Sequence, residues 1–246
     1  KIVNGKIENK EVLLLEHLKF NSETFDITAL KKLNELNKYS ANTKILGDIV
    51  ESSQGITVYA KVQGEKINYF RDNDLEDGSK KYLKGRDINK YENNWDSTYI
   101  IYGKHLWCKR DKKYFENPKI FLRQTSDRII ATYIEEPFYC IDSIHSLIQL
   151  NKDFDLKYIL SILNSKFGDY LFKLLISETG KVFAQVKLTF LRRIPIKFIK
   201  NQSIFINKVE KIIENKQTNE DTTDLEQQID NLVYKLYELT YDEVLV

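Results

Sequence analysis

The sequence predicts an α+β fold: a β-rich domain with a packed helix, followed by a C-terminal antiparallel helical hairpin. Short runs of β-branched and aromatic residues, separated by turn residues, fill the centre of the 246-residue chain. Beyond Asp155, apolar residues recur at spacings of three and four, as on one face of a helix. We therefore expect an N-terminal connecting segment over residues 1–45, the β-rich domain over 46–200 and the hairpin over 201–246.

The expected strands follow from local composition. A strand-like stretch at 11–18 and a helix at 27–37, with Asp26 as a candidate N-cap, precede the centre. Residues 46–59 are typical of a strand, a turn and a second strand, and the polar residues 68–82 of an exposed loop. Further strands are expected at 98–102, 119–123, 128–134 and 138–141.

Apolar periodicity predicts the helices. Residues 156–174 form one helix with a broad apolar face, an extended run at 188–196 follows, and a helix at 205–216 leads to a polar turn. The last helix has the four-three spacing of a coiled-coil seam at Leu225, Ile229, Leu232, Leu236 and Leu239. This seam packs either within the chain, on residues 156–175, or on another domain.

Composition excludes several classes of protein. The 42% hydrophobic and 12% aromatic content predicts a folded chain rather than a disordered one. Cys108 and Cys140 are the only cysteines, and three histidines lack ligand-like spacing, so we expect neither a disulfide framework nor a zinc site. Without a long apolar run or leader, a cytoplasmic protein with no membrane partner is expected. Since Lys1 opens a chain without methionine, we expect it to begin inside a longer protein.

The basic charge is concentrated in the middle of the chain. Residues 79–130 hold 13 lysines and arginines against 6 acidic side chains, together with nine aromatic residues, whereas residues 201–246 hold 4 basic against 10 acidic side chains. Basic and aromatic side chains in alternation suit the surface of a polyanion. A solvated face on a β-rich domain with buried aromatics is the alternative.

No catalytic motif is complete. The strings at 117–120 and 136–139 lack the second proline of an amino-methyltransferase loop, and no glycine-rich loop suits a nucleotide cofactor. Glu8 and Lys10, like Glu214 and Lys216, have Glu-x-Lys spacing without a convincing upstream carboxylate. We expect no catalytic residue, cofactor site or metal site in this chain, and a polar or structural role for residues 142–145.

An ordered set of short blocks nevertheless identifies a family. The blocks are Leu83–Tyr91, Tyr99–Tyr102, Phe115–Ile120, Arg123–Arg128, Asp142–His145, Leu160–Ser165, Phe183–Lys187 and Ile194–Ile196. Together they resemble the TaqI-like C-terminal specificity domain, the target recognition domain of restriction-modification enzymes, over residues 45–246. The end at Leu225–Tyr237 is similar to the helical end of single-chain, type IIG-like enzymes.

The resemblance implies that the chain recognises double-stranded DNA and does not itself catalyse a reaction. The parent enzyme of such a domain methylates adenine, and many members also cut DNA. S-adenosylmethionine and Mg2+ would thus belong to upstream methyltransferase or nuclease domains of the same protein. Two alternatives stay open: a fragment of a type I specificity subunit, or a protein-interaction module that uses the hairpin.

Candidate DNA contacts come from the basic and aromatic segment and from these blocks. Most of the cations are expected to hold phosphates; they are Lys84, Arg86, Lys90, Lys104, Lys109, Arg110, Lys112 and Lys113. Arg123, Gln124, Thr125 and Arg128 suit base edges. Alternatively, the two arginines brace the fold through Asp127 or Asp142. The remaining candidates are Tyr91, Trp107, His145 and Lys187.

Overall fold

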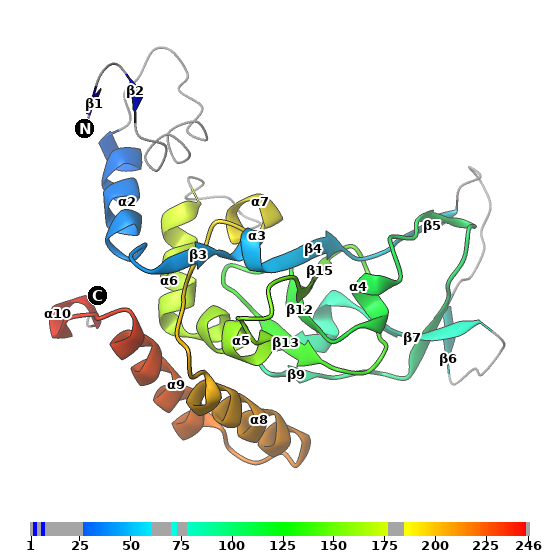
Figure 1. Ribbon diagram of the computed structural model, residues 1–246. Helices are drawn as coiled ribbons and strands as arrows, with labels where there is room; N and C mark the ends of the chain where they lie inside the picture. The colour runs from blue at the N-terminus through cyan, green and yellow to red at the C-terminus, as the bar shows by residue number, and fades with distance from the viewer. Residues whose placement is uncertain are drawn as a thin grey trace.

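A four-stranded antiparallel sheet lies at the centre of the computed structural model (Figure 1), which describes residues 2–3, 6–7, 27–60, 70–72, 78–176 and 185–244. Its strand order is β13-β12-β15-β4. The strands are β4 (Val50–Gln54), β12 (Lys119–Arg123), β13 (Ala131–Ile134) and β15 (Ile144–Gln149). The sheet joins segments far apart in the chain, because β15 lies between β12 and β4.

This sheet is buried on both faces because its strands alternate two sets of apolar side chains. Ile120, Leu122 and Leu147 belong to the core that contains the helices. Phe121 and Ile144 belong to a second core on the β-rich side. The predicted strands at 119–123 and 128–134 are therefore confirmed, with β13 beginning at Ala131.

The second core is enclosed by a mixed sheet of order β14-β7-β10-β6. Its strands are β6 (Phe70–Asp72), β7 (Ser79–Leu83), β10 (Thr98–Ile101) and β14 (Tyr139–Cys140). The prediction of a loop over 68–82 is wrong at both ends, because β6 and β7 each pair with β10. Phe115 of the short helix α4 (Lys113–Glu116) stacks on Tyr139 with ring centroids 4.7 Å apart.

Four short antiparallel strand pairs complete the β-structure. Near the N-terminus, β1 (Ile2–Val3) pairs with β2 (Lys6–Ile7), and β3 (Thr43–Ile45) pairs with β16 (Pro195–Lys197). In the β-rich part, β5 (Thr57–Ala60) pairs with β11 (Leu106–Cys108), and β8 (Ile88–Asn89) pairs with β9 (Glu92–Asn93). One-turn helices, α3 (Leu46–Ile49) and α7 (Leu188–Leu191), replace the start of two predicted extended runs.

The predicted helix over 156–174 is two helices, α5 (Leu156–Asn164) and α6 (Lys166–Leu175). The helix is interrupted at Ser165. The backbone of this residue is extended, and its side chain accepts a hydrogen bond from the Gly168 amide. A Cβ atom at residue 168 would lie 2.1 Å from the Ile162 carbonyl oxygen, so glycine lets the two helices meet closely. Apolar periodicity cannot reveal such a break, because both helices keep the same spacing.

The C-terminal helices form the expected hairpin and pack within the chain. The helices α8 (Ser203–Gln217) and α9 (Thr223–Leu236) contact each other and α5. Ile229, Val233 and Tyr237 are buried, while Leu225 and Leu232 are only partly buried. A final turn, α10 (Tyr241–Val244), begins where the amide and hydroxyl of Thr240 donate to the Glu243 carboxylate, in the Thr-x-x-Glu spacing of a capping box. Packing on residues 156–175 is confirmed.

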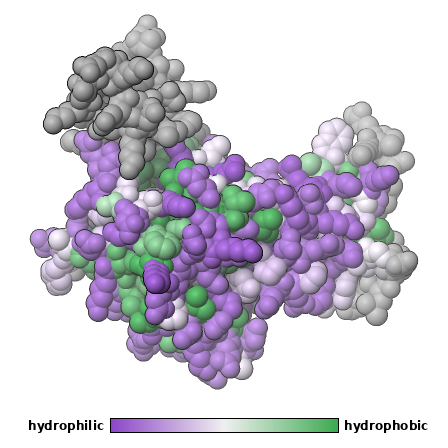
Figure 2. All heavy atoms as spheres, in the orientation of Figure 1, coloured by the Kyte–Doolittle hydropathy of each residue, from purple (hydrophilic) through white to green (hydrophobic). Residues whose placement is uncertain are grey.

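The N-terminal part also joins the helical core. The helix α2 (Ile27–Lys38) packs on α6, and Tyr39 meets the Phe167 ring edge-on at 5.0 Å. The expected strand at 11–18 and the Asp26 cap lie outside the described residues, and the division into three parts stays a prediction. Within the described ranges, every helix is too short or too polar to cross a membrane. Most of the β-rich half is hydrophilic in the view of Figure 2.

Candidate nucleic-acid interface

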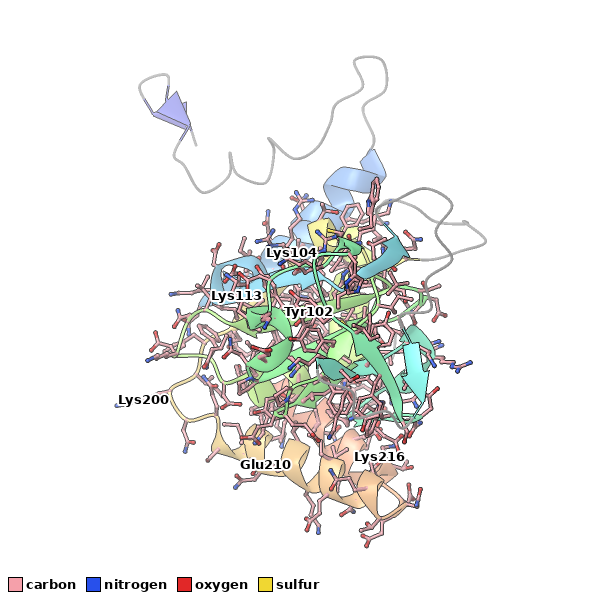
Figure 3. The ribbon with its side chains drawn as sticks, turned by 90° about the vertical axis from the view of Figure 1, so that its right-hand side faces the viewer. Tyr102, Lys104, Lys113, Lys200, Glu210 and Lys216 are labelled. Carbon is pink, nitrogen blue, oxygen red and sulfur yellow. The ribbon has the colours of Figure 1, made fainter. Side chains whose placement is uncertain are left out.

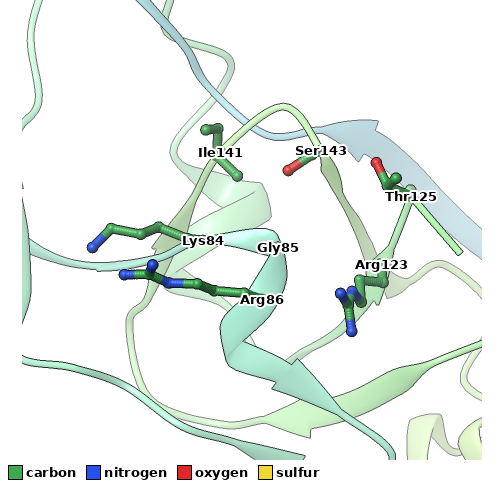
Figure 4. A pocket seen from close by; sticks show the side chains of 7 residues that line it. All are labelled: Lys84, Gly85, Arg86, Arg123, Thr125, Ile141 and Ser143. Carbon is green, nitrogen blue, oxygen red and sulfur yellow. The ribbon is translucent and has the colours of Figure 1, made fainter.

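A hollow of about 400 Å3 opens where three of the sequence blocks meet (Figure 4). We call it the basic hollow, and its lining consists of Lys84, Gly85, Arg86, Arg123, Thr125, Ile141 and Ser143. These residues come from the end of β7, the end of β12 and the turn between β14 and β15. The lining contains cations and hydroxyls but no carboxylate.

Hydrogen bonds fix the three walls of the basic hollow. The 3-10 turn η1 (Gly85–Asp87) is held by Asp87, whose carboxylate accepts from the Lys84 amide at 2.7 Å. The Gln124 amide donates to the Ser143 carbonyl at 2.8 Å and ties the end of β12 to the β14–β15 turn. A Cβ atom on Gly85 would lie 3.0 Å from Ser143 Oγ, so a larger residue at 85 would narrow the opening.

The cations of the basic hollow differ in their partners. Lys84 Nζ and Arg86 Nη2 lie 2.9 and 3.3 Å from the same Asp96 oxygen, and Figure 4 shows their side chains running together away from Arg123. The hydrogen bond from Thr98, and then that from Lys84, lowers the pKa of Asp96. Arg123, on the opposite wall, has no hydrogen bond or ion pair to any side chain in the described part of the chain.

A second group of cations lies on the basic loop, residues 102–113. Lys104, Lys109 and Lys112 are exposed, and Lys112 lies 5.8 Å from the Tyr102 ring centroid. Trp107 is 63% exposed and sits where the pairing of β11 with β5 shifts register, as at a β-bulge that re-aims a side chain. Figure 3 shows Tyr102, Lys104 and Lys113 on the part of the molecule away from α8.

Two other cations of the basic loop are anchored to the sheet. Arg110 Nε donates to the Gly55 carbonyl at 3.3 Å, and its backbone has a positive φ of 60°. Lys113 Nζ lies 2.5 Å from Glu51 Oε1, and this hydrogen bond lowers the pKa of Glu51. These contacts hold the loop in place, although Lys113 is 41% exposed at its side chain.

Tyr91 and His145 are corrections to the candidate set, because neither side chain is available to DNA. Tyr91 is 2% exposed within the helical core, where burial raises its pKa. His145 is 1% exposed, its Nε2 lies 2.7 Å from the Val186 carbonyl oxygen, and burial lowers its pKa. Sequence blocks identify residue types, but they do not show on which face of a strand a side chain lies.

The other candidates take varied positions. Lys90 donates to the Asn164 carbonyl at 2.6 Å and braces the β8–β9 turn against α5. Arg128 pairs with its sequence neighbour Asp127 at 3.2 Å, and both side chains are exposed, so the pair joins no two elements of the fold. Thr125 is exposed, and Gln124 and Lys187 are half-buried near the start of α7. Asp142 accepts from Thr57 at 3.1 Å instead of pairing with an arginine.

The structure adds four residues to the site that were not candidates: Gly85, Asp96, Ile141 and Ser143. Ile141 directly precedes the block at 142–145. Gly85 and Ser143 lie inside recognisable blocks, at 83–91 and 142–145, so the blocks themselves were the available signal. Asp96 lies in none of the blocks, and only the fold brings it to Lys84 and Arg86.

A larger hollow of opposite charge, about 990 Å3, lies between β9, β13 and α8. Its acidic side chains are Glu92, Glu135, Glu136, Glu210 and Glu214. Two lysines also line it, and one of them, Lys157, lies 2.5 Å from Glu210. We call it the acidic groove. Among the described residues, no group of His, Cys, Asp and Glu is arranged to hold a metal ion.

Residues 80–196 match the family of TaqI-like C-terminal specificity domains, which confirms the resemblance of the sequence blocks. The chain is similar to the type IIG restriction endonuclease BpuSI, with a TM-score of 0.51 and 11% identity over 86% of this chain and 33% of that chain. This likeness shows the shared α+β fold. A comparison with curated proteins finds no match.

Two type I proteins are also similar to parts of the chain. The S subunit from M. genitalium has a TM-score of 0.40 and 14% identity over 71% of this chain and 38% of that chain. The HsdS subunit from Thermoanaerobacter tengcongensis has a TM-score of 0.39 and 10% identity over 93% and 54%. The chain therefore spans between 33% and 54% of the length of these three proteins.

Proposed function

We propose that this chain recognises a sequence in double-stranded DNA as the specificity part of a restriction-modification protein. One observation carries the proposal: three blocks far apart in the sequence meet at the basic hollow, and every residue of its lining lies within the residues that match the specificity-domain family. A lining of cations and hydroxyls without a carboxylate suits a polyanion.

In this proposal, one group of side chains contacts phosphates and another contacts base edges. Lys104, Lys109 and Lys112 carry exposed charges that attract phosphates regardless of sequence. Specificity then comes from side chains that enter the major groove, where each base pair presents its own pattern of donors and acceptors. Thr125 and Gln124, at the end of β12, are candidates for such contacts, and Trp107 offers a flat apolar surface.

The parent protein proposed for this domain is a single-chain adenine-specific DNA methyltransferase, with or without endonuclease activity. The resemblance of residues 225–237 to the helical end of such enzymes supports it, as does the fold shared with a type IIG endonuclease. S-adenosylmethionine and Mg2+ would act in the upstream domains, and the protein would work in the cytoplasm. A type I specificity subunit is the second candidate, since two S subunits are also similar in structure.

Selection from a randomised duplex library tests the proposed function. The chain is incubated at low salt with duplexes that carry a random central segment, and retained molecules are amplified and sequenced over several rounds. We expect one short motif to be enriched, because direct readout discriminates each wrong base pair by about 1–3 kcal/mol. Retention of no duplex would contradict DNA recognition and favour the protein-interaction module.

The enriched motif also tests the proposed parent. If the parent methylates adenine, the motif should coincide with a sequence that carries N6-methyladenine in the genome of the source organism. A motif that coincides with no methylated adenine would contradict the adenine-specific parent while leaving DNA recognition intact.

A further inference from the structure

We propose that the basic hollow seats one phosphate of the DNA backbone and that Arg123 is its principal ligand. This inference rests on the proposed function, and it assigns Arg123 to holding the register of the domain on DNA rather than to reading a base. It resolves the two alternatives that the sequence leaves for Arg123, a base contact or an internal brace.

Among the described residues, the carboxylates near the hollow have other partners, which argues against a bracing role for Arg123. Lys84 and Arg86 share Asp96, and Arg128 pairs with Asp127. Arg123 lines the same hollow as Lys84 and Arg86 and, within the described residues, has no carboxylate partner. A cation left without an internal anion in a hollow is available for an external one, and a guanidinium fits phosphate with two parallel hydrogen bonds.

The chemistry of the lining favours an acceptor-only ligand. Adenine and cytosine edges present a donor and suit amides or carboxylates, whereas a phosphate and a guanine edge present acceptors only. Charged donors and the hydroxyls of Thr125 and Ser143 supply the polar side-chain groups of the hollow. Such a set suits an acceptor-only anion.

The rigidity of the walls supports a register-fixing contact. Arg123 is the last residue of β12, where its amide donates to the Ile130 carbonyl at 2.9 Å. Ser143 is tied to the next residue, Gln124, by the 2.8 Å backbone hydrogen bond. Asp96 holds Lys84 and Arg86 at the rim with their side chains directed away from Arg123, so Arg123 is the cation that a phosphate in the hollow would meet.

The first test compares Arg123→Gln with the wild-type chain on the duplex enriched by selection and on an unselected duplex, over a series of KCl concentrations. A lost phosphate contact weakens binding to both duplexes by a similar factor, roughly tenfold at low salt, and reduces the slope of log K against log salt by about one. Arg123→Lys keeps the charge and should keep the slope. Lys200→Gln, which removes an exposed charge between β16 and α8, outside the lining of the hollow, is the matched control and should leave the slope nearly unchanged.

A second test localises the phosphate. A set of duplexes, each with one phosphodiester replaced by a neutral methylphosphonate, is bound by the wild-type chain and by Arg123→Gln. At one position the replacement should weaken the wild type by the same factor as the arginine substitution and have no further effect on Arg123→Gln.

Three results would overturn the proposal. Loss of affinity by Arg123→Gln only for the selected sequence would make Arg123 a base contact, and a lowered melting temperature with an unchanged salt slope would make it a brace. Additive effects at every methylphosphonate position would place the phosphate elsewhere. Failure of the proposed function is distinct from all three, because the wild-type chain itself would then bind no duplex.

Discussion

The basic hollow and the acidic groove both lie beside strand ends of the β-rich half, yet their charges are opposite. In the basic hollow, Lys84 and Arg86 share one carboxylate and Arg123 has no partner among the described side chains. In the acidic groove, five glutamates face two lysines. A DNA duplex would be attracted to one hollow and repelled by the other, so under the proposed function the contrast would orient the domain on DNA.

The helical hairpin creates this contrast. The acidic groove exists because α8 lies beside β9 and β13, and it carries Glu210 and Glu214 to that side. The basic hollow is built from strand ends and turns of the β-rich half, without a residue of α8 or α9. The near-zero formal net charge of +2 therefore hides two surfaces of opposite sign.

The largest expected effect is the loss of DNA affinity when the charge of the basic loop is reversed. The triple substitution Lys104→Glu, Lys109→Glu and Lys112→Glu should lower the affinity for any duplex on the order of a hundredfold at low salt, because three phosphate contacts become repulsive. Fluorescence anisotropy with labelled duplex measures it.

A second triple, Glu92→Gln, Glu135→Gln and Glu214→Gln in the acidic groove, neutralises three charges on the other surface. It should change affinity by less than about threefold, through long-range attraction that salt screens. Similar large effects from the two triples would mean that the contrast between the surfaces does not orient DNA.

The next effect concerns the buried contact between β13 and α5. Asn164, which is 4% exposed, donates to the Ala131 carbonyl at 2.9 Å and accepts from its amide at 3.1 Å. Asn164→Ala leaves both groups without these partners and should lower the free energy of unfolding by about 2 kcal/mol. Urea denaturation measures the loss, and Asn94→Ala, at an exposed position, should change it by less than about 0.5 kcal/mol. Equal stability of the two variants would show that this contact does not hold β13 to α5.

A smaller effect is expected at Trp107, one of two tryptophans in the chain. Duplex DNA should quench the emission of the wild-type chain and leave that of Trp107→Phe unchanged, because Trp95 is packed against Tyr99 and Phe138. Trp107→Ala should weaken binding by about 1 kcal/mol. Quenching that persists in Trp107→Phe would place DNA near Trp95 instead of on the basic loop.

The smallest effect is the pH dependence that His145 contributes to stability. Its Nε2–H donates to the Val186 carbonyl, and its Nδ1 has no hydrogen-bond partner among the described residues, so protonation would place a buried charge there. Burial lowers the folded pKa below the ordinary value of 6.5. The stabilisation is complete above pH 6.5 and is lost as the pH falls toward the folded pKa, with a slope of at most about 1.4 kcal/mol per pH unit. His145→Gln should remove this part of the pH dependence in urea denaturation at pH 7 and pH 5, and an unchanged dependence would contradict the assignment.

The sequence predicts the local elements better than their partners. The strands at 119–123 and 138–141 and the hairpin follow from composition and spacing within a few residues. The placement of β15 between β12 and β4 joins residues far apart in the chain, and no local pattern encodes it. The interruption at Ser165 could not be predicted either, because a hydrogen bond to the Ser165 side chain, and not a change of apolar spacing, separates α5 from α6.

The sequence predicts which residue types form the site, but it does not predict which of these side chains are exposed. Residues 79–130 are basic in composition, yet Lys119 is fully buried, where it donates to the Glu136 carbonyl at 2.6 Å and burial lowers its pKa to about 8. Tyr91 and His145 are buried in the same way. The basic hollow depends on Asp96 and Ser143, which only the folded chain brings beside the two cationic blocks.

Lysine acetylation with and without bound duplex, read by mass spectrometry, tests most directly which surface faces DNA. Bound duplex should protect Lys104, Lys109 and Lys112 on the basic loop, and the acetylation of Lys157 and Lys216 in the acidic groove should stay unchanged. Protection of Lys157 and Lys216, with the basic loop still fully reactive, would contradict the proposed orientation.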